Sequence, residues 1–98
     1  MKRTEAITRL QADAGAVKAM GATSLYLFGS AARDEALDGS DLDLFIDYDP
    51  RRKFSLFDLV GIQLFLEERL GTEVDLTTRD SLHPRLREGI ERSAIRVF

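Results

Sequence analysis

Apolar side chains recur with a helical period in two long stretches of the sequence. Residues 4–20 predict an amphipathic helix. Residues 55–70 predict another, because Ser55 and Asp58 are spaced as a capping box that precedes an apolar run. A short helix is expected after Pro84. The side chains expected to face a core are Ile7, Leu10, Ala14 and Val17 in the first helix, and Leu86 and Ile90 in the last.

Extended segments alternate with these helices. Residues 24–28 are a short apolar run, which predicts a strand buried on both faces. Residues 41–48 and 73–77 alternate between polar and apolar side chains, as strands do when one face lies on a core, and residues 95–98 predict a last strand. Strands interleaved with helices predict a layered α/β (α+β) fold, and we expect residues 1–98 to form a single domain.

The composition is that of an ordinary globular protein, with 44% hydrophobic and 32% charged residues. The absence of cysteine excludes a disulfide scaffold, a thiolate metal site and a cysteine nucleophile, and it suits a reducing compartment. No apolar run approaches the roughly 18 residues that span a bilayer, and the N-terminus lacks the apolar segment of a signal peptide. We therefore expect a cytoplasmic protein without a membrane partner.

The net charge of −3 is unevenly distributed along the chain. Residues 34–49 contain seven acidic residues and no basic one, whereas the rest of the chain carries an excess of four positive charges. Blocks of one sign are usually solvated or disordered. Here Leu42, Leu44 and Ile46 alternate with the acids, so we expect an ordered strand that holds the carboxylates in place.

Three of the acids have the arrangement of a metal site. Asp41 and Asp43 lie two residues apart, and side chains with that spacing project from the same face of a strand, about 6.6 Å apart at Cα. Asp75 lies on the polar face of another predicted strand. A polar strand face often has such a pair without binding anything, but Asp is unfavourable in strands and like charges repel unless a cation lies between them. Oxygen-only ligands of this kind favour Mg²⁺.

A turn of small residues follows the first predicted strand. Gly29 allows a close approach of the backbone, and Ser30 offers a hydroxyl group beside the N–H groups of the next turn, which together predict a phosphate site. Such a turn alone is weak evidence, and Arg33 alone would be a surface residue. A phosphate site followed after about ten residues by a pair of metal ligands predicts an enzyme that transfers a nucleotidyl or phosphoryl group.

These segments carry a family resemblance. Gly-Ser-Ala-Ala-Arg at residues 29–33, followed by Ser-Asp-Leu-Asp-Leu at residues 40–44, resembles the paired signature of the minimal nucleotidyltransferases, the small branch of the DNA polymerase beta-like superfamily. The likeness extends over nearly the whole chain and implies a mixed β-sheet flanked by helices. The sequence departs from the family at Asp34, where a glycine is common.

The resemblance also implies roles for particular residues. Asp41, Asp43 and Asp75 would be catalytic and would bind Mg²⁺, as two ions, with Asp75 also available as a base. The triphosphate of ATP would be held by Gly29, Ser30, Arg33 and Ser40. Many members are antitoxins (MntA-type) of HEPN/MNT modules, which transfer AMP from ATP to a tyrosine hydroxyl of an all-helical HEPN ribonuclease toxin.

Other functions remain open from the residues alone. The chain could neutralise a toxin by binding alone, as a catalytically weak or inactive protein with the nucleotidyltransferase fold. Transfer to a small molecule is disfavoured because no second domain would form its pocket, and sequence-specific DNA binding is disfavoured because the basic residues are scattered. We expect His83 to cap a helix or lie on the surface, residues 51–53 to be solvated, and the phenylalanines at positions 54, 57 and 65 to form core or a partner interface.

Overall fold

A computed structural model describes residues 1–37 and 39–98; Asp38, one of the seven acids, lies outside the described residues. Four strands form one sheet in the order β3-β2-β1-β4, with β2 and β3 parallel and the other neighbouring pairs antiparallel. The mixed sheet flanked by helices confirms the predicted fold class. The elements are α1 (Arg3–Ala12), α2 (Ala14–Ala19), β1 (Ala22–Phe28), α3 (Gly29–Ala32), β2 (Leu42–Tyr48), α4 (Leu56–Leu70), β3 (Val74–Thr78), the 3₁₀ helix η1 (Arg79–Ser81), α5 (Pro84–Ser93) and β4 (Ile95–Arg96).

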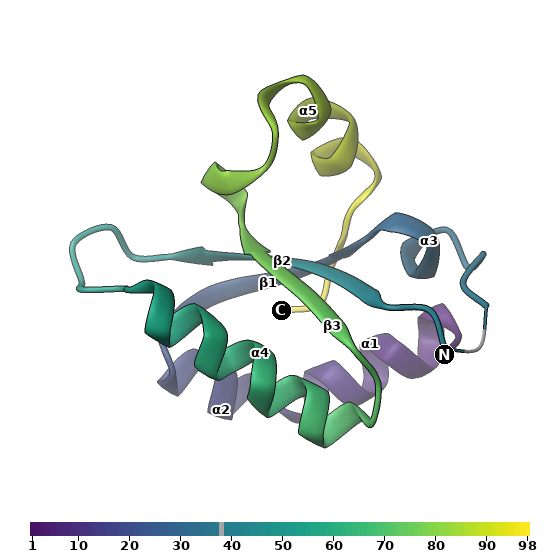
Figure 1. The fold of residues 1–98 in the computed structure, drawn as a ribbon, viewed down its shortest axis with the longest axis horizontal. Coiled ribbons are helices and arrows are strands. Elements are labelled where there is room, and N and C mark those ends of the chain that lie inside the picture. Colours follow the sequence, from purple (N-terminus) through teal and green to yellow (C-terminus); the bar gives the residue numbers. More distant parts are fainter. Residues whose placement is uncertain (38) are drawn as a thin grey trace.

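Helices α1, α2 and α4 cover one face of the sheet, and α5 stands on the other side (Figure 1). The core lies between the sheet and the first three of these helices, because the aliphatic side chains of β1 and β2 alternate onto that face. The aromatic rings of Tyr26, Phe28 and Phe45 lie on the other face. Fully buried members of this core include Leu10, Val17, Leu25, Leu27, Leu44, Ile46, Ile62 and Leu66. The acidic side of β2 is therefore left facing α3 and α5.

The predicted helix over residues 4–20 is wrong in one respect: it is divided into α1 and α2 at Asp13. Asp13 leaves the helical conformation (φ −101°, ψ 10°), and its buried carboxylate accepts a hydrogen bond from Nε of Arg69 on α4 at 3.2 Å. An aspartate inside a helix competes with the backbone for hydrogen bonds, which favours a break. Ala14 consequently lies only partly buried rather than in the core.

Helix α4 forms as the sequence predicts. The backbone N–H of Asp58 donates to the Ser55 hydroxyl, and the Asp58 carboxylate accepts from the Ser55 N–H at 2.8 Å, which completes the capping box. Gly71 ends the helix in the left-handed conformation at φ 68°. One face of the helix is buried, while Leu56, Phe57, Val60 and Leu64 are exposed on the other.

Helix α5 begins at Pro84 as predicted, and His83 caps it by accepting the Arg85 N–H at its Nδ1 atom. The prediction that Leu86 points inward is wrong, since its side chain is 60% exposed, and Ile90 is only partly buried. No side chain of α5 is fully buried, because the sheet face below it is covered by aromatic rings and by Arg79 rather than left open for a helix.

The strands match their predicted positions. β1 begins two residues earlier than expected, and β4 is confined to Ile95–Arg96, although Leu25 continues the pairing with Val97 and Phe98 through backbone hydrogen bonds. Among the residues that the structure describes, no helix is long and apolar enough to cross a membrane.

Candidate active site

The sheet register brings two of the predicted acids together. Asp43 on β2 is the parallel partner of Asp75 on β3, so both carboxylates project from the same face on neighbouring strands. Asp41 lies immediately before β2 and is exposed, as is Asp75, whereas Asp43 is partly buried. The structure thus places the three acids around one end of the sheet, with Asp43 in the middle.

The surroundings of Asp43 make its charge unfavourable. Burial raises the pKa of the Asp43 carboxyl group, the negative charges of Asp75 and Asp41 raise this pKa further, and the charge of Arg33 opposes them. A carboxylate with two like neighbours is stabilised by a cation among them.

The Gly29 turn lies directly against this acid. Gly29 starts α3 with φ 72°, and a Cβ atom placed on it would overlap Oδ2 of Asp43. Phe28, the residue before it, pairs with Asp43 across the β1–β2 ladder. The predicted phosphate turn therefore lies against Asp43, one of the predicted metal ligands, and only glycine satisfies both the backbone angle and the space available.

Arg33 and Asp34 complete the turn. Arg33 ends α3 and forms an exposed ion pair with Glu35 at 3.1 Å. Its side chain lies near enough to Asp43 for its charge to lower the pKa of that carboxyl group, but its ion pair is with Glu35. Asp34 is the one described residue other than glycine with a positive φ, at 59°. Its carboxylate accepts the backbone N–H of Arg3 at 3.0 Å. Asp tolerates this left-handed conformation better than most residues, which explains how it fits where the family commonly has glycine.

Ser40 has a local role in the structure. Its hydroxyl oxygen accepts the backbone N–H of Leu37 at 3.2 Å, and its own N–H donates to the Leu37 carbonyl. These bonds join Ser40 to Leu37 and orient the chain before Asp41. The predicted contact of Ser40 with the nucleotide stays a prediction.

A hollow of about 450 Å³ opens between α3 and α5 beside the acids. One wall is apolar and includes Phe28, Leu86 and Ile90, while Arg33 and Arg85 border it. It reaches Gly29 and therefore adjoins Asp43. The sequence did not single out Arg85 or the apolar wall as site residues, because Leu86 and Ile90 carry the spacing of an ordinary buried helix face.

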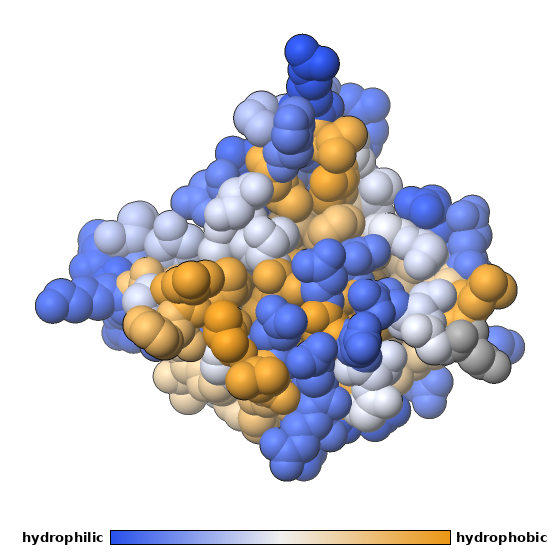
Figure 2. All heavy atoms as spheres, in the orientation of Figure 1, coloured by the Kyte–Doolittle hydropathy of each residue, from blue (hydrophilic) through white to orange (hydrophobic). Residues whose placement is uncertain are grey.

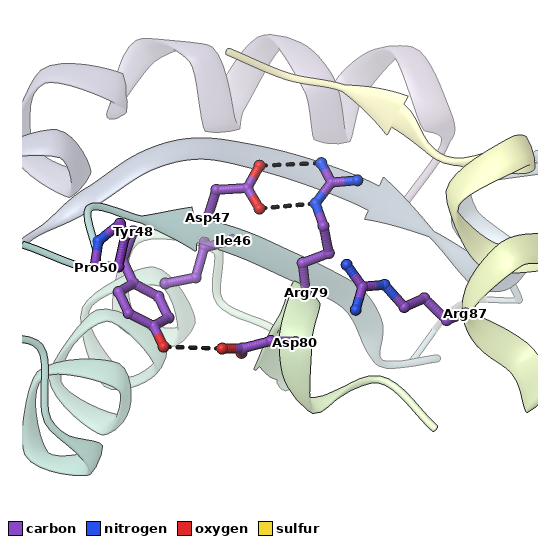
Figure 3. Close-up of a pocket in the computed structure, with 7 residues that line it drawn as sticks. All are labelled: Ile46, Asp47, Tyr48, Pro50, Arg79, Asp80 and Arg87. Carbon is purple, nitrogen blue, oxygen red and sulfur yellow. Dashed lines mark hydrogen bonds and ion pairs between the residues drawn. The ribbon is translucent and has the colours of Figure 1, made fainter. Parts of the chain in front are cut away.

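Helix α5 is held above the sheet by Arg79, which the sequence analysis also missed. The Arg79 guanidinium donates to both carboxylate oxygens of Asp47, at 2.7 and 3.0 Å, as Figure 3 shows, and to Glu91 on α5 at 2.6 Å. These bonds hold the pKa of the Asp47 carboxyl below its usual value, and the pKa of Glu91 is lowered by Arg79 and Arg87. The guanidinium also stacks on the rings of Tyr26 and Phe45. No sequence signal links Asp47 to a residue 32 positions away.

The carboxylate oxygens at this site are the kind of ligand that Mg²⁺ prefers. A cation beside Asp43 would also relieve the repulsion by Asp41 and Asp75 that contributes to the raised pKa of the Asp43 carboxyl group. Within residues 1–37 and 39–98, no three acidic, histidine or cysteine side chains already surround a position for an ion. This agrees with the usual behaviour of Mg²⁺, which is bound by one or two carboxylates together with substrate phosphates and water.

The sequence is similar to those of known proteins. The "Putative protein adenylyltransferase MJ0435" of Methanocaldococcus jannaschii is 40% identical over 78 residues, which cover 80% of this chain and 82% of the relative. The protein adenylyltransferase MntA of Thermococcus cleftensis is 33% identical over 77 residues, covering 79% and 76%.

Solved structures of related proteins have the same fold. A protein described under "Structure of putative minimal nucleotidyltransferase" superimposes with a TM-score of 0.82 at 38% identity, over 97% of this chain and 95% of the other. The complex of a tri-AMPylated Shewanella oneidensis HEPN toxin with its MNT antitoxin gives a TM-score of 0.65 at 15% identity, over 90% and 68%, which is a likeness of fold alone.

A profile of the nucleotidyltransferase domain matches residues 14–97 and so includes every element from α2 to β4. Together with the close superposition and the curated relatives, this match establishes the family of the chain. The chain therefore belongs to the nucleotidyltransferases, enzymes that transfer a nucleotidyl group, and within them to the minimal nucleotidyltransferases.

Proposed function

We propose that this chain is an antitoxin that transfers AMP from ATP to a tyrosine hydroxyl of a HEPN ribonuclease toxin, with Mg²⁺, in the cytoplasm. The observation that carries the proposal is the placement of Asp43 between two further acids and against the Gly29 turn. This placement would bring the proposed Mg²⁺ site next to the proposed phosphate site. The names of the adenylyltransferase relatives and the likeness of fold to an MNT antitoxin in complex with an AMPylated toxin support it.

In this proposal each residue has a limited task. Asp41, Asp43 and Asp75 would hold Mg²⁺, which when bound supplies positive charge to the phosphates. Gly29 and Ser30 would lie against the triphosphate, with Arg33 near its charge.

The reaction forms a bond between the tyrosine oxygen and the α-phosphorus of ATP and breaks the bond from that phosphorus to pyrophosphate. Asp75 is exposed on an edge strand and would receive the tyrosine proton, while the turn at Gly29 and Ser30 would hold the phosphates in line with the incoming oxygen.

The test is a mass measurement on a toxin encoded beside this gene and co-expressed with the chain. With ATP and Mg²⁺ the toxin is expected to gain increments of about 329 Da, one for each AMP added, and fragment spectra should place them on tyrosine. A toxin that is silenced while its mass is unchanged would support the alternative, neutralisation by binding alone. Increments on another residue type would contradict the tyrosine assignment.

The hollow between α3 and α5 is proposed to receive the nucleoside part of ATP. Its apolar wall suits a purine base, and its arginines suit phosphate. Leu86→Ser is therefore expected to weaken ATP binding about tenfold while leaving the affinity for tripolyphosphate, which has no base, unchanged.

Isothermal titration of both ligands would measure this difference. Leu64→Ser is the matched control, because Leu64 is exposed to the same degree (59% against 60%) but lies on α4, away from the hollow. Equal losses for ATP and tripolyphosphate would show that Leu86 acts on the phosphate site or on α5 as a whole rather than on the base.

A further inference from the structure

Helix α4 presents an apolar surface to solvent. Leu56, Phe57, Val60 and Leu64, here called the α4 stripe, lie on the side of the helix opposite its buried residues. Phe57 is 89% exposed and Leu56 72%. Figure 2 shows a hydrophobic patch over the position of α4, the helix that carries these exposed side chains. Contiguous exposed patches of this kind mark interaction surfaces, whereas single exposed apolar residues do not.

Charged residues of opposite sign lie at the two ends of the α4 stripe. Arg52 and Lys53 precede the helix and are exposed. Glu68 is exposed one helical turn beyond Leu64, on the same face. In the described part of the chain neither Lys53 nor Glu68 takes part in an ion pair. The stripe is thus basic at its N-terminal end, apolar along its length and acidic at its C-terminal end.

This order of charges is complementary to itself. When two such helices pack antiparallel about a two-fold axis, the basic end of each lies beside the acidic end of the other, and the apolar side chains meet in the middle. Antiparallel packing also places the positive end of each helix dipole beside the negative end of its neighbour. A two-fold interface requires this kind of self-complementary surface, and no other partner's surface has to be assumed.

We propose that the α4 stripe is the interface of a homodimer in which two α4 helices pack antiparallel. Lys53 of each copy would face Glu68 of the other, and Phe57 and Leu64 would be buried at the centre. The sheet separates α4 from the face that carries Asp43, so this pairing leaves the candidate active site open (Figure 1). The proposal does not depend on the identity of the acceptor or on catalysis.

The test measures the mass of the purified chain by light scattering across a dilution series. The wild-type chain is expected to dissociate from dimer to monomer on dilution, and Leu64→Glu should raise the dissociation constant at least about tenfold, because it would bury a charge at the interface. Leu37→Glu is the control, since Leu37 is also exposed but lies outside α4. A wild-type chain that is monomeric throughout, including one that associates only with a co-expressed toxin, overturns the proposal.

Charge reversal tests the antiparallel orientation. Lys53→Glu alone and Glu68→Lys alone are each expected to weaken the dimer several-fold, because each creates two like-charged pairs across the interface. Mixing the two variants should restore the wild-type affinity, because both pairs in the mixed dimer are then of opposite sign. Mixing that restores nothing would contradict this orientation. Circular dichroism and ATP titration of each variant check that the fold and the active site are unchanged.

Discussion

Replacing Asp41 and Asp43 together with Asn is expected to abolish AMP transfer while the chain stays folded. The two carboxylates are the central donors of the proposed Mg²⁺ site, and their loss should lower kcat by about three orders of magnitude or more, in line with the several kcal/mol that a bound metal contributes. The measurement is the rate of AMP incorporation into a co-expressed toxin. Glu73→Gln with Asp49→Asn removes the same number of charges from residues outside the site and should leave the rate unchanged.

Stability gives an independent readout of the same variant. The pKa of Asp43 is raised in the fold, so the free energy of unfolding falls as the pH rises from the ordinary value of 3.8 through this higher pKa, where the folded carboxyl ionises. Near neutral pH the Asn variant should therefore be at least as stable as the wild type. Mg²⁺ with ATP should raise the Tm of the wild type but not of the variant, because only the wild type binds the ion. A variant that still transfers AMP would exclude these acids as the metal ligands.

Gly29→Ala is expected to remove nearly all activity by displacing Asp43. An alanine at φ 72° costs about 1–2 kcal/mol of stability from the left-handed backbone alone. The added methyl group would also overlap the Asp43 carboxylate, which must then move. Because a displacement of about 1 Å in a reacting geometry lowers rates about a hundredfold, we expect at least that loss in kcat.

Gly71→Ala separates strain from the collision. Gly71 has nearly the same φ, 68°, and a Cβ atom there would meet no atom within 4 Å. Both variants should lose stability in a thermal or urea melt, Gly29→Ala at least as much as Gly71→Ala because of the added collision, but only Gly29→Ala should lose activity. Equal activity in the two variants would show that the position of the Asp43 carboxylate does not depend on its contact with Gly29.

Local sequence was sufficient for most of the secondary structure. The Ser55–Asp58 capping box and Gly71 determine the limits of α4 through backbone hydrogen bonds within a few residues. Alternation predicted β2 and β3 because it reports directly which side chains face the core.

Two predictions failed where distant residues decide the outcome. The break at Asp13 accompanies its bond to Arg69, 56 positions away. Leu86 is exposed because the sheet below α5 is already covered by stacked rings and Arg79. Periodicity shows which side of a helix is apolar, but it does not show whether anything lies against that side.

For the candidate site, the sequence by itself determined which groups are present. The paired motifs at residues 29–33 and 40–44 identified the glycine turn and the acids, since their spacing along the chain is a local property. Only the tertiary structure decided how they meet. The parallel register of β2 and β3 places Asp75 beside Asp43, and the chain path at Gly29 brings the turn into contact with that acid. Strand pairing and side-chain contact join residues far apart in the chain, so they follow from packing of the whole fold rather than from any local pattern.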